Sequence, residues 1–383
     1  MTVTAPQGFR AAGVAAGLKS SGGLDVALVV NDGPSQAAAG VFTRNRVRAA
    51  PVLWCEQVLT TGQLAAVVLN SGGANACTGP EGFADTHRTA EHVAGELGIG
   101  AIDVAVASTG LIGLRLPMPE LLSGISAAVR ELSSDGGRNA AEAIMTTDSV
   151  PKQASLTRAG FTVGGMAKGA GMLAPGLATM LVVLTTDAHV GAAALDVALR
   201  SASALTFDRV DSDGAMSTND TVLLLASGAS GAPPDQAALT EAVTDVCHDL
   251  AQQLLADAEG STKDISITVE KAAGIDDALA VARAVARNNL VKCAFFGADP
   301  NWGRILAAVG TTAAAFDPSA LDVVINGVEV CRAGGIGEDR EACDLSGRAV
   351  DVRVRLHAGQ HEATVWTNDL SLAYVHENSA YSS

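Results

Sequence analysis

One glycine-rich stretch of the sequence, residues 164–186, holds the side chains best suited to chemistry. Its first half contains five glycines and a single cation, Lys168, and glycine permits positive φ and close backbone approach. Its second half, from Thr179 to Leu184, is a β-branched and aliphatic run that predicts a buried strand. We therefore expect a flexible loop that presents the Thr179 hydroxyl at the first position of a core strand. Beside free N–H groups and a lysine, that hydroxyl needs only a base to act as a nucleophile.

No base lies near Thr179 in the sequence. The residues between Asp148 and Asp187 include no His, Asp or Glu, so neighbouring residues cannot supply a Ser-His-Asp arrangement. The α-amino group of Thr179 itself would serve as the base if the chain were cut between Ala178 and Thr179. Ala178 is small enough to let the hydroxyl attack the preceding carbonyl in an N-to-O acyl shift. The same residues also fit a threonine that merely begins a strand, and both interpretations stay open.

Further candidates lie at two other predicted strand ends. The strand Asp103–Ala107 runs into Ser108-Thr-Gly-Leu-Ile-Gly113. A hydroxyl next to a glycine N–H can form an oxyanion hole, in which donors face developing negative charge, although Ser-Thr-Gly is also a common turn. The polar segment from Asn70 to Cys77 follows the strand Leu64–Leu69. That segment is either the wall of a pocket or a tight turn.

Apolar spacing predicts the elements that position these side chains. The predicted strands, besides those already named, are Val26–Val30, Gly40–Thr43, Gln153–Thr157, Thr221–Ala226, Ile265–Glu270, Val323–Val328, Ala349–Leu356 and Glu362–Thr367. The predicted helices are Glu81–Leu97, Pro119–Leu132, Arg138–Ile144, Ala192–Leu205, Asp235–Ala258 and Asp276–Arg287. A soft domain boundary is expected near Thr262.

Composition narrows the classes of function. With 383 residues, 48% of them hydrophobic and 17% charged, the chain can bury a large core and form two domains. A net charge of −16 without a Lys/Arg cluster argues against nucleic acid or an anionic membrane as a partner. The six cysteines show no CxxC spacing, and the N-terminus lacks a signal pattern. We expect a cytoplasmic protein with reduced thiols and no membrane anchor.

Familiar cofactor and metal motifs do not fit this sequence. Gly169-Ala-Gly-Met-Leu-Ala174 matches GxGxxA, but a predicted strand follows where a dinucleotide-binding turn requires a helix. The sequence contains no GxxxxGK[ST], HExxH or GxSxG pattern. We therefore predict no metal and no bound cofactor.

Seven short segments spread along the chain together form a pattern that is specific enough to indicate a protein family. They are Asn70-Ser-Gly-Gly-Ala-Asn-Ala-Cys-Thr-Gly79, Ser108-Thr-Gly-Leu-Ile-Gly113, Met145-Thr-Thr-Asp148, the Lys168–Met180 loop, Ser217-Thr-Asn-Asp-Thr221, Phe296-Gly-Ala-Asp-Pro-Asn-Trp-Gly-Arg304 and Glu377-Asn-Ser-Ala-Tyr381. In these segments the chain resembles the bifunctional glutamate N-acetyltransferase/ornithine acetyltransferase family of arginine biosynthesis. The resemblance runs from Gly8 to the last residue.

The resemblance implies a precursor that cuts itself between Ala178 and Thr179. The new N-terminal Thr179 would accept an acetyl group from N2-acetyl-L-ornithine and pass it to L-glutamate. Thr109 and Gly110 would form the oxyanion hole. The implied substrate-binding residues are Thr146, Lys168, Thr179, Glu259, Asn378 and Ser383. Lys168 suits an α-carboxylate and Glu259 an ammonium, so both ends of a zwitterionic amino acid would be held.

The fold implied by the resemblance is an αββα sandwich of the aminopeptidase/ornithine acetyltransferase type, over residues 1–262. A smaller C-terminal α/β domain, residues 263–383, would return its tail to the active site. The expected assembly is an α2β2 heterotetramer of the two fragments. The tail carries both tyrosines of the chain, Tyr374 and Tyr381, which favours a docked end over a frayed one. Ala215 departs from the family pattern, where we expect an acidic or hydroxyl residue.

Two functional alternatives remain open from the sequence. An aminopeptidase or amidase of the same sandwich would use the same self-released nucleophile with water as the acceptor, although Glu259 and a docked tail favour transfer. A non-catalytic amino-acid-binding protein would keep its chain uncut, which a denaturing gel distinguishes from both enzymes. The sequence does not decide whether acetyl-CoA is a second acetyl donor, or whether the chain serves arginine biosynthesis or specialised metabolism.

Overall fold

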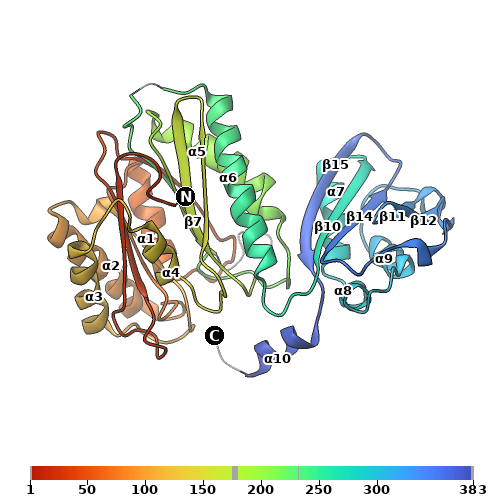
Figure 1. Cartoon of the computed structure of the whole chain (residues 1–383), viewed down its shortest axis with the longest axis horizontal. Helices are drawn as coiled ribbons and strands as arrows, with labels where there is room; N and C mark the ends of the chain where they lie inside the picture. The colour runs from red at the N-terminus through yellow and green to blue at the C-terminus, as the bar shows by residue number, and fades with distance from the viewer. Residues whose placement is uncertain (1, 175–179, 232, 381–383) are drawn as a thin grey trace.

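The computed structural model describes residues 2–174, 180–231 and 233–380. Within these residues the strands form three sheets (Figure 1). Three residues of the predicted site, Ala178, Thr179 and Ser383, lie outside the described residues.

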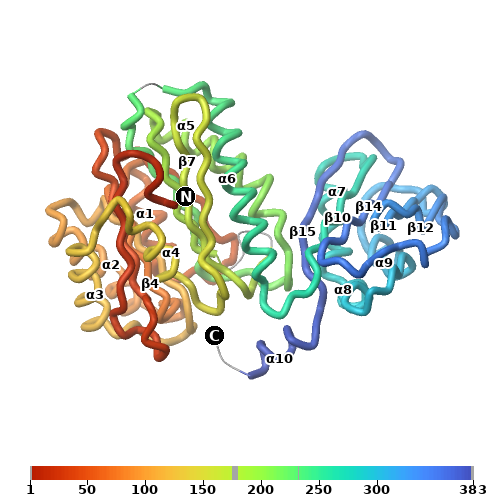
Figure 2. Tube along the Cα trace, in the orientation of Figure 1, coloured from red at the N-terminus to blue at the C-terminus, as the bar shows by residue number. Residues whose placement is uncertain are grey.

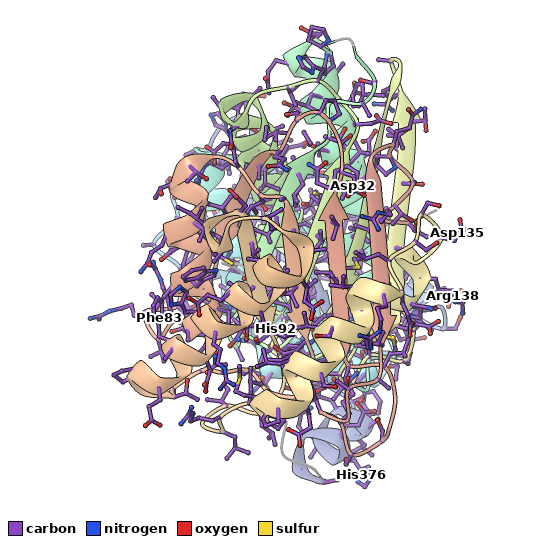
Figure 3. All side chains as sticks on the ribbon, turned by 90° about the vertical axis from the view of Figure 1, so that its left-hand side faces the viewer. Asp32, Phe83, His92, Asp135, Arg138 and His376 are labelled. Carbon is purple, nitrogen blue, oxygen red and sulfur yellow. The ribbon has the colours of Figure 1, made fainter. Side chains whose placement is uncertain are left out.

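The first sheet has the strand order β1-β2-β4-β5. Its strands are β1 (Phe9–Val14), β2 (Val26–Asn31), β4 (Ala66–Asn70) and β5 (Val104–Ser108). Helices α2 (Gly79–Leu97) and α3 (Met118–Arg130) cover its outer side (Figure 3), and α1 (Ala50–Val58) packs against β5. Strands β4 and β5 are parallel, and Asn70 pairs with Ser108 at their ends. The polar segments that follow these two strands therefore leave the sheet at the same edge.

The second sheet has the order β3-β9-β8-β7-β6. Its strands are β3 (Ala37–Phe42), β9 (Thr221–Ala226), β8 (Leu181–Thr186), β7 (Phe161–Lys168) and β6 (Lys152–Arg158). Successive residues of β8 point to opposite faces of the sheet, as in any β-strand, and so contribute to two different cores. Leu181 packs against the first sheet. Val182 packs against α5 (Ala192–Leu205) and α6 (Gln236–Ala256). The resulting layers, helices, sheet, sheet and helices, confirm the predicted αββα sandwich (Figure 2).

The expectation of a loop beginning at residue 164 is wrong. Gly164 and Gly165 lie inside β7, which pairs antiparallel with β8. A Cβ on Gly164 would lie 2.4 Å from the carbonyl oxygen of Thr2, and one on Gly165 would lie 2.7 Å from Leu184 Cδ2. These glycines therefore let the N-terminal segment and a core leucine pack closely on the strand. The following strand, β8, begins at Leu181.

Helix α4 (Gly137–Ala143) positions the segment that leads to β6. It packs on β1 and also contacts β7. The approach to β1 depends on Gly13, because a Cβ there would lie 2.0 Å from the carbonyl oxygen of Asn139. At the end of α4, the Ala143 carbonyl accepts a hydrogen bond of 2.5 Å from Ser71 Oγ. The segment after α4 is thereby held beside the segment after β4.

The chain after α6 forms a sheet with the order β13-β12-β11-β14-β10-β15. Its strands are β10 (Asp264–Ala272), β11 (Asp322–Ile325), β12 (Val328–Arg332), β13 (Gly335–Ile336), β14 (Ala349–Arg355) and β15 (His361–Asn368). The accompanying helices are α7 (Ile275–Ala286), α8 (Asn289–Phe296) and α9 (Trp302–Val309). Short 3₁₀ helices are Leu59–Thr61, Ala101–Asp103, Phe207–Arg209, Pro318–Ala320 and Arg340–Ala342. The domain boundary near Thr262 stays a prediction.

The single strand predicted at Val323–Val328 is wrong, because the structure has two strands there. Asn326 and Gly327 separate β11 from β12, with φ of +46° and +86°. Two successive residues with positive φ are typical of a tight hairpin turn, for which Asn-Gly is a strong signal.

Helix α10 (Leu372–Ala380) leads from the last sheet back toward the sandwich (Figure 1). Ser371 Oγ donates to the carbonyl oxygen of Gly260 at 2.5 Å. Among the described residues, no helix combines the length and apolarity needed to span a bilayer.

Candidate active site

A small cavity at the edge of the sandwich gathers the predicted site residues that the structure describes. It measures about 60 Å³ and is lined by Thr109, Gly110, Thr146, Thr147, Lys168, Gly171, Met172, Glu259 and Asn378. Six predicted residues are among them: Thr109, Gly110, Thr146, Lys168, Glu259 and Asn378. They come from segments far apart in the chain, and only folding brings them together. The individual roles assigned to them stay predictions.

The Thr109-Gly110 segment is held by backbone bonds to the loop after β4. Thr109 N donates to Asn70 O at 2.9 Å, and Gly73 N donates to Thr109 O at 3.0 Å. Gly110 has a φ of +126°, and a Cβ there would lie 2.8 Å from Gly73 N. The two strand-end segments thus touch so closely that position 110 requires glycine. Both the threonine hydroxyl and the glycine backbone line the cavity.

Lys168, the last residue of β7, is only 2% exposed. Its Nζ lies 3.4 Å from Thr109 Oγ1 and 4.0 Å from Asp148 Oδ2. Burial lowers the pKa of Lys168, while the negative charge of Asp148 acts in the opposite direction. A lysine in this position can attract an anionic substrate group as a point charge.

Asp148 is a buried carboxylate that joins two sides of the cavity. Its Oδ1 accepts hydrogen bonds of 2.6 Å from Lys152 Nζ and from Gly169 N, and its Oδ2 accepts one of 3.0 Å from Thr146 N. Burial by itself would raise the pKa of Asp148, but Lys168 and Lys152 outweigh that effect and hold the pKa at about 2. The ionised carboxylate therefore fixes the positions of Thr146 and Lys168.

Lys152 extends this network to the third side of the cavity. Its side chain is fully buried and also donates to Asp257 Oδ2 at 2.5 Å. Asp257 precedes Glu259 by two residues and accepts a second bond of 3.0 Å from Ser149 N. Sequence reasoning missed both Lys152 and Asp257. The available signal was a cation at the start of a predicted strand, but its partner lies 105 residues away.

Glu259 holds the C-terminal helix against the cavity. Its Oε1 accepts a bond of 2.7 Å from Thr147 Oγ1, and its Oε2 accepts one of 3.0 Å from Asn378 Nδ2 of α10. Gly171 faces the same carboxylate, since a Cβ there would lie 2.7 Å from Oε2. The tail thus meets the residue for which the sequence predicted a substrate-binding role.

Asp220 is a buried acid directly before β9 that sequence reasoning did not single out. Its Oδ1 accepts a bond of 3.1 Å from the backbone N of Met180, the first described residue after Thr179. Burial raises the pKa of Asp220 well above its usual value and favours the protonated form. The position of β8 at the cavity end is therefore fixed by a fully buried carboxyl group.

The αββα sandwich, with a hydroxyl, a lysine and a carboxylate gathered at its strand ends, defines the class of this protein. The protein is an αββα-fold enzyme whose site suits a small polar substrate. The model of the ArgJ family matches residues 10–383. The chain belongs to the ArgJ family.

Similar curated proteins cover the whole chain. The arginine biosynthesis bifunctional protein ArgJ of Streptomyces coelicolor is 64% identical over 383 residues, with 100% of both chains aligned. The protein of the same name from Thermobifida fusca is 62% identical over 382 residues, again with 100% of both. That of Mycobacterium tuberculosis strain H37Rv is 62% identical over 389 residues, which are 100% of this chain and 96% of the relative.

Two solved structures are also similar. Ornithine acetyltransferase complexed with ornithine from Mycobacterium tuberculosis is 65% identical, with a TM-score of 0.45, over 47% of this chain and 96% of that chain. The arginine biosynthesis bifunctional protein argJ from Bacillus halodurans is 34% identical, with a TM-score of 0.49, over 51% of this chain and 97% of that chain.

Proposed function

We propose that the protein is a glutamate N-acetyltransferase of arginine biosynthesis, which moves the acetyl group of N2-acetyl-L-ornithine to L-glutamate. The observation that carries the proposal is the full-length similarity, at 61–65% identity, to proteins named arginine biosynthesis bifunctional protein ArgJ. The cavity supports it, because Lys168 and Glu259 offer a cation and a carboxylate to an amino acid. The relatives' shared description as bifunctional supports acetyl-CoA as a second donor, with no bound cofactor.

The nucleophile of this proposal is made by cutting the chain. The Thr179 hydroxyl attacks the carbonyl carbon of Ala178, the peptide C–N bond breaks, and the hydroxyl proton passes to the departing amine. Water then hydrolyses the ester and leaves Thr179 with a free α-amino group. That amine is the base that no neighbouring residue provides.

Transfer then proceeds in two steps. The amine takes the Thr179 hydroxyl proton as Oγ attacks the acetyl carbonyl, and the proton passes to ornithine as the amide C–N bond breaks. The glutamate amine next attacks the acetyl ester, the C–O bond breaks, and the proton returns to Oγ. The hydroxyl of Thr109 and the N–H of Gly110 face the oxygen that becomes negative in both steps.

Five further residues form the substrate-binding site in this proposal. Lys168 attracts the α-carboxylate, and Thr146 lies beside it through their shared contact with Asp148. Glu259, Asn378 and Ser383 close the site from the tail side and limit the access of water. Well-oriented reactants reach effective molarities of roughly 10⁵ M or more, which lets glutamate compete with water. The protein would work in the cytoplasm as an α2β2 assembly.

An aminopeptidase or amidase with the same nucleophile is the second candidate, favoured only by the shared sandwich. Incubating the purified protein with N2-acetyl-L-ornithine and L-glutamate separates the two. The proposal predicts one acetyl-glutamate for each ornithine released, and replacing the donor with acetyl-CoA tests the second activity. Release of free acetate without acetyl-glutamate would make the protein a hydrolase.

A further inference from the structure

A cluster of arginines lies where the sandwich meets helix α7. Its members are Arg44 after β3, Arg209 in the 3₁₀ helix after α5, Arg283 in α7 and Arg287 directly after α7. Arg44 Nη2 lies 3.9 Å from Asp208 Oδ1, and Arg283 Nη2 donates to the carbonyl oxygen of Asp208 at 3.3 Å. Two segments of the sandwich and one helix of the C-terminal part therefore bring their cations to the same place.

The positive charges of this arginine cluster outnumber the carboxylates that pair with them. Arg287 Nε donates to Asp211 Oδ2 at 2.7 Å, and Arg44 shares Asp208 with Arg283. Arg209 makes no ion pair within the described residues, since its Nε donates to the carbonyl oxygen of Ala204 at 3.2 Å. Four guanidinium groups thus face two carboxylates, although the whole chain has a net charge of −16.

The arginines are close enough to affect each other. Burial lowers the pKa of Arg209, and the positive charge of Arg283 lowers it further. Burial also lowers the pKa of Arg283, and Arg44 and Arg287 act in the same direction while Asp211 and Asp208 oppose them. Arg283 Nε is buried and has no hydrogen-bond partner among the described residues. An anion that joined the cluster would relieve the repulsion between these cations.

The cluster is open to solvent on the side of two of its members. The side chain of Arg44 is 62% exposed, and that of Arg287 is 47% exposed. The contact of Arg44 with Asp208 is long and exposed, and such pairs are weak. A planar guanidinium can bind two oxygens of one phosphate in parallel, so arginines are common in phosphate sites. The cluster therefore suits a ligand that carries phosphate groups.

The cluster lies at the same end of the second sheet as the proposed nucleophile. Arg44 follows Thr43, whose backbone N donates to the carbonyl oxygen of Asp220 at 3.0 Å. Asp220 Oδ1 in turn accepts a bond of 3.1 Å from the backbone N of Met180. Met180 directly follows Thr179 in the sequence. Two hydrogen bonds thus connect the neighbour of Arg44 to the neighbour of the nucleophile.

The two acetyl donors of the proposed function differ in their phosphate groups. N2-acetyl-L-ornithine is small and has none. Acetyl-CoA carries its acetyl group at one end of a long flexible arm and its phosphate groups at the other. A site for acetyl-CoA therefore needs cations at some distance from the nucleophile, and transfer from N2-acetyl-L-ornithine does not use them.

We propose that the arginine cluster binds the phosphate groups of acetyl-CoA while the thioester of this second donor reaches Thr179. The inference rests on the proposed function. In the step that it adds, Thr179 Oγ attacks the thioester carbonyl carbon and the C–S bond breaks. The hydroxyl proton passes through the α-amino group of Thr179 to the departing thiolate. The product is the same acetyl ester that N2-acetyl-L-ornithine forms.

A double variant tests the assignment. Arg44→Gln/Arg209→Gln should lower kcat/KM for acetyl-CoA about 10- to 100-fold, the range of one hydrogen bond to a charged group. It should leave kcat/KM for N2-acetyl-L-ornithine nearly unchanged. Arg138→Gln is the matched control, because Arg138 also pairs with a carboxylate, Glu142, and its side chain is 73% exposed on α4. This control removes a surface arginine outside the cluster and should not affect either donor.

A shortened donor shows whether the phosphate groups are responsible. S-Acetylpantetheine has the thioester but no phosphate, so wild type and the double variant should use it equally well. Equal losses for acetyl-CoA and S-acetylpantetheine, or no loss for acetyl-CoA, in a variant whose melting temperature matches wild type would overturn the assignment. Wild type that uses N2-acetyl-L-ornithine but not acetyl-CoA would also overturn it. Failure of wild type with both donors would instead overturn the proposed function.

Discussion

At the scale of single residues, the candidate site depends on one carboxylate between two lysines. Asp148 lies within 4.0 Å of Lys168 Nζ and 2.6 Å from Lys152 Nζ, and its side chain is fully buried. A buried charge that loses its partners is strongly destabilising. The carboxylate therefore has two effects, since it opposes the burial that lowers the pKa of Lys168 and holds the segments around it in place.

The first prediction concerns the pH dependence of stability. The pKa of Asp148 in the folded protein, about 2, lies below its ordinary value of 3.8. The folded state therefore gains stability from this group above about pH 4 and loses it as the pH falls toward 2. The gain is about 2 kcal/mol. Urea unfolding of Asp148→Asn should show a weaker decline in the free energy of unfolding between pH 5 and pH 2 than wild type.

A surface carboxylate provides the control for that prediction. Asp32 (Figure 3) pairs with Arg10 at 2.6 Å, with its side chain 43% exposed. Exposed pairs contribute little to stability, so Asp32→Asn should retain nearly the wild-type decline. Parallel curves for wild type and Asp148→Asn would contradict the pairing of Asp148 with the two lysines.

The second prediction concerns Thr109. Removing one oxyanion donor typically lowers kcat about 10²- to 10³-fold, and Thr109→Ala should do so. The backbone bonds of Thr109 to Asn70 and Gly73 do not involve its side chain, so the fold should persist. Thr109→Ser keeps the hydroxyl and should retain most of the activity in the acetyl-transfer assay. Wild-type kcat in Thr109→Ala would remove its hydroxyl from the mechanism.

Candidate functional residues could be predicted from the sequence only where a short, continuous segment reveals them. Lys168 stands out as a lone cation in a glycine-rich stretch, and Thr109 stands out beside glycine at a strand end. Lys152 and Asp257 could not be assigned, because their pairing joins segments 105 residues apart.

At the scale of elements, helix α10 depends on a glycine in the sandwich. Gly260 has a φ of +61°, and a Cβ there would lie 2.2 Å from Tyr374 N at the start of α10. The helix can therefore reach Glu259 only because position 260 has no side chain. Asn378, in the last turn of the helix, then bonds to Glu259.

The third prediction follows from that contact. Gly260→Ala should displace α10 and raise KM for N2-acetyl-L-ornithine severalfold in steady-state assays, with the sandwich still folded. Gly98→Ala is the matched control, because Gly98 also has a positive φ, +71°, but no atom near its missing Cβ. Backbone strain alone would affect both variants equally. Unchanged kinetics in a stably folded Gly260→Ala would mean that α10 does not shape the site.

Many elements were predictable because their apolar spacing is regular. The helix Ala192–Leu205 and the strand Thr221–Ala226 have the predicted bounds. Apolar spacing gave a wrong prediction where tertiary packing decides the conformation. The glycines of β7 predicted a loop, because the residues that pack closely on them are distant in sequence. The short helix α1 and the hairpin at Asn326-Gly327 were also missed, since each is too short to show a clear period.

At the scale of the whole molecule, the proposed cut would leave two pieces that share one sheet. Strands β3, β6 and β7 come before the cut, and β8 and β9 come after it. In the sheet, β8 and β9 lie between β3 and β7. Each piece therefore supplies backbone partners that the other needs, and neither has a complete second sheet alone.

The fourth prediction is that the two pieces stay together after cutting. Size-exclusion chromatography without denaturant should give one peak that contains both pieces, whereas a denaturing gel should separate them. Alkaline or high-salt buffers should not release either piece, because the contact is a buried sheet. Elution of separate pieces under native conditions would contradict this interleaved arrangement for the cut protein.

The central claim is that an acetyl group passes through Thr179 of a self-cut chain. The most direct test is intact-mass spectrometry of the purified protein before and after incubation with N2-acetyl-L-ornithine alone. The account predicts two chains, residues 1–178 and 179–383, with one acetyl group added to the N-terminal threonine of the second chain and removed again by L-glutamate. A single uncut chain that is fully active, or two chains that transfer acetyl without ever carrying it, would contradict the account.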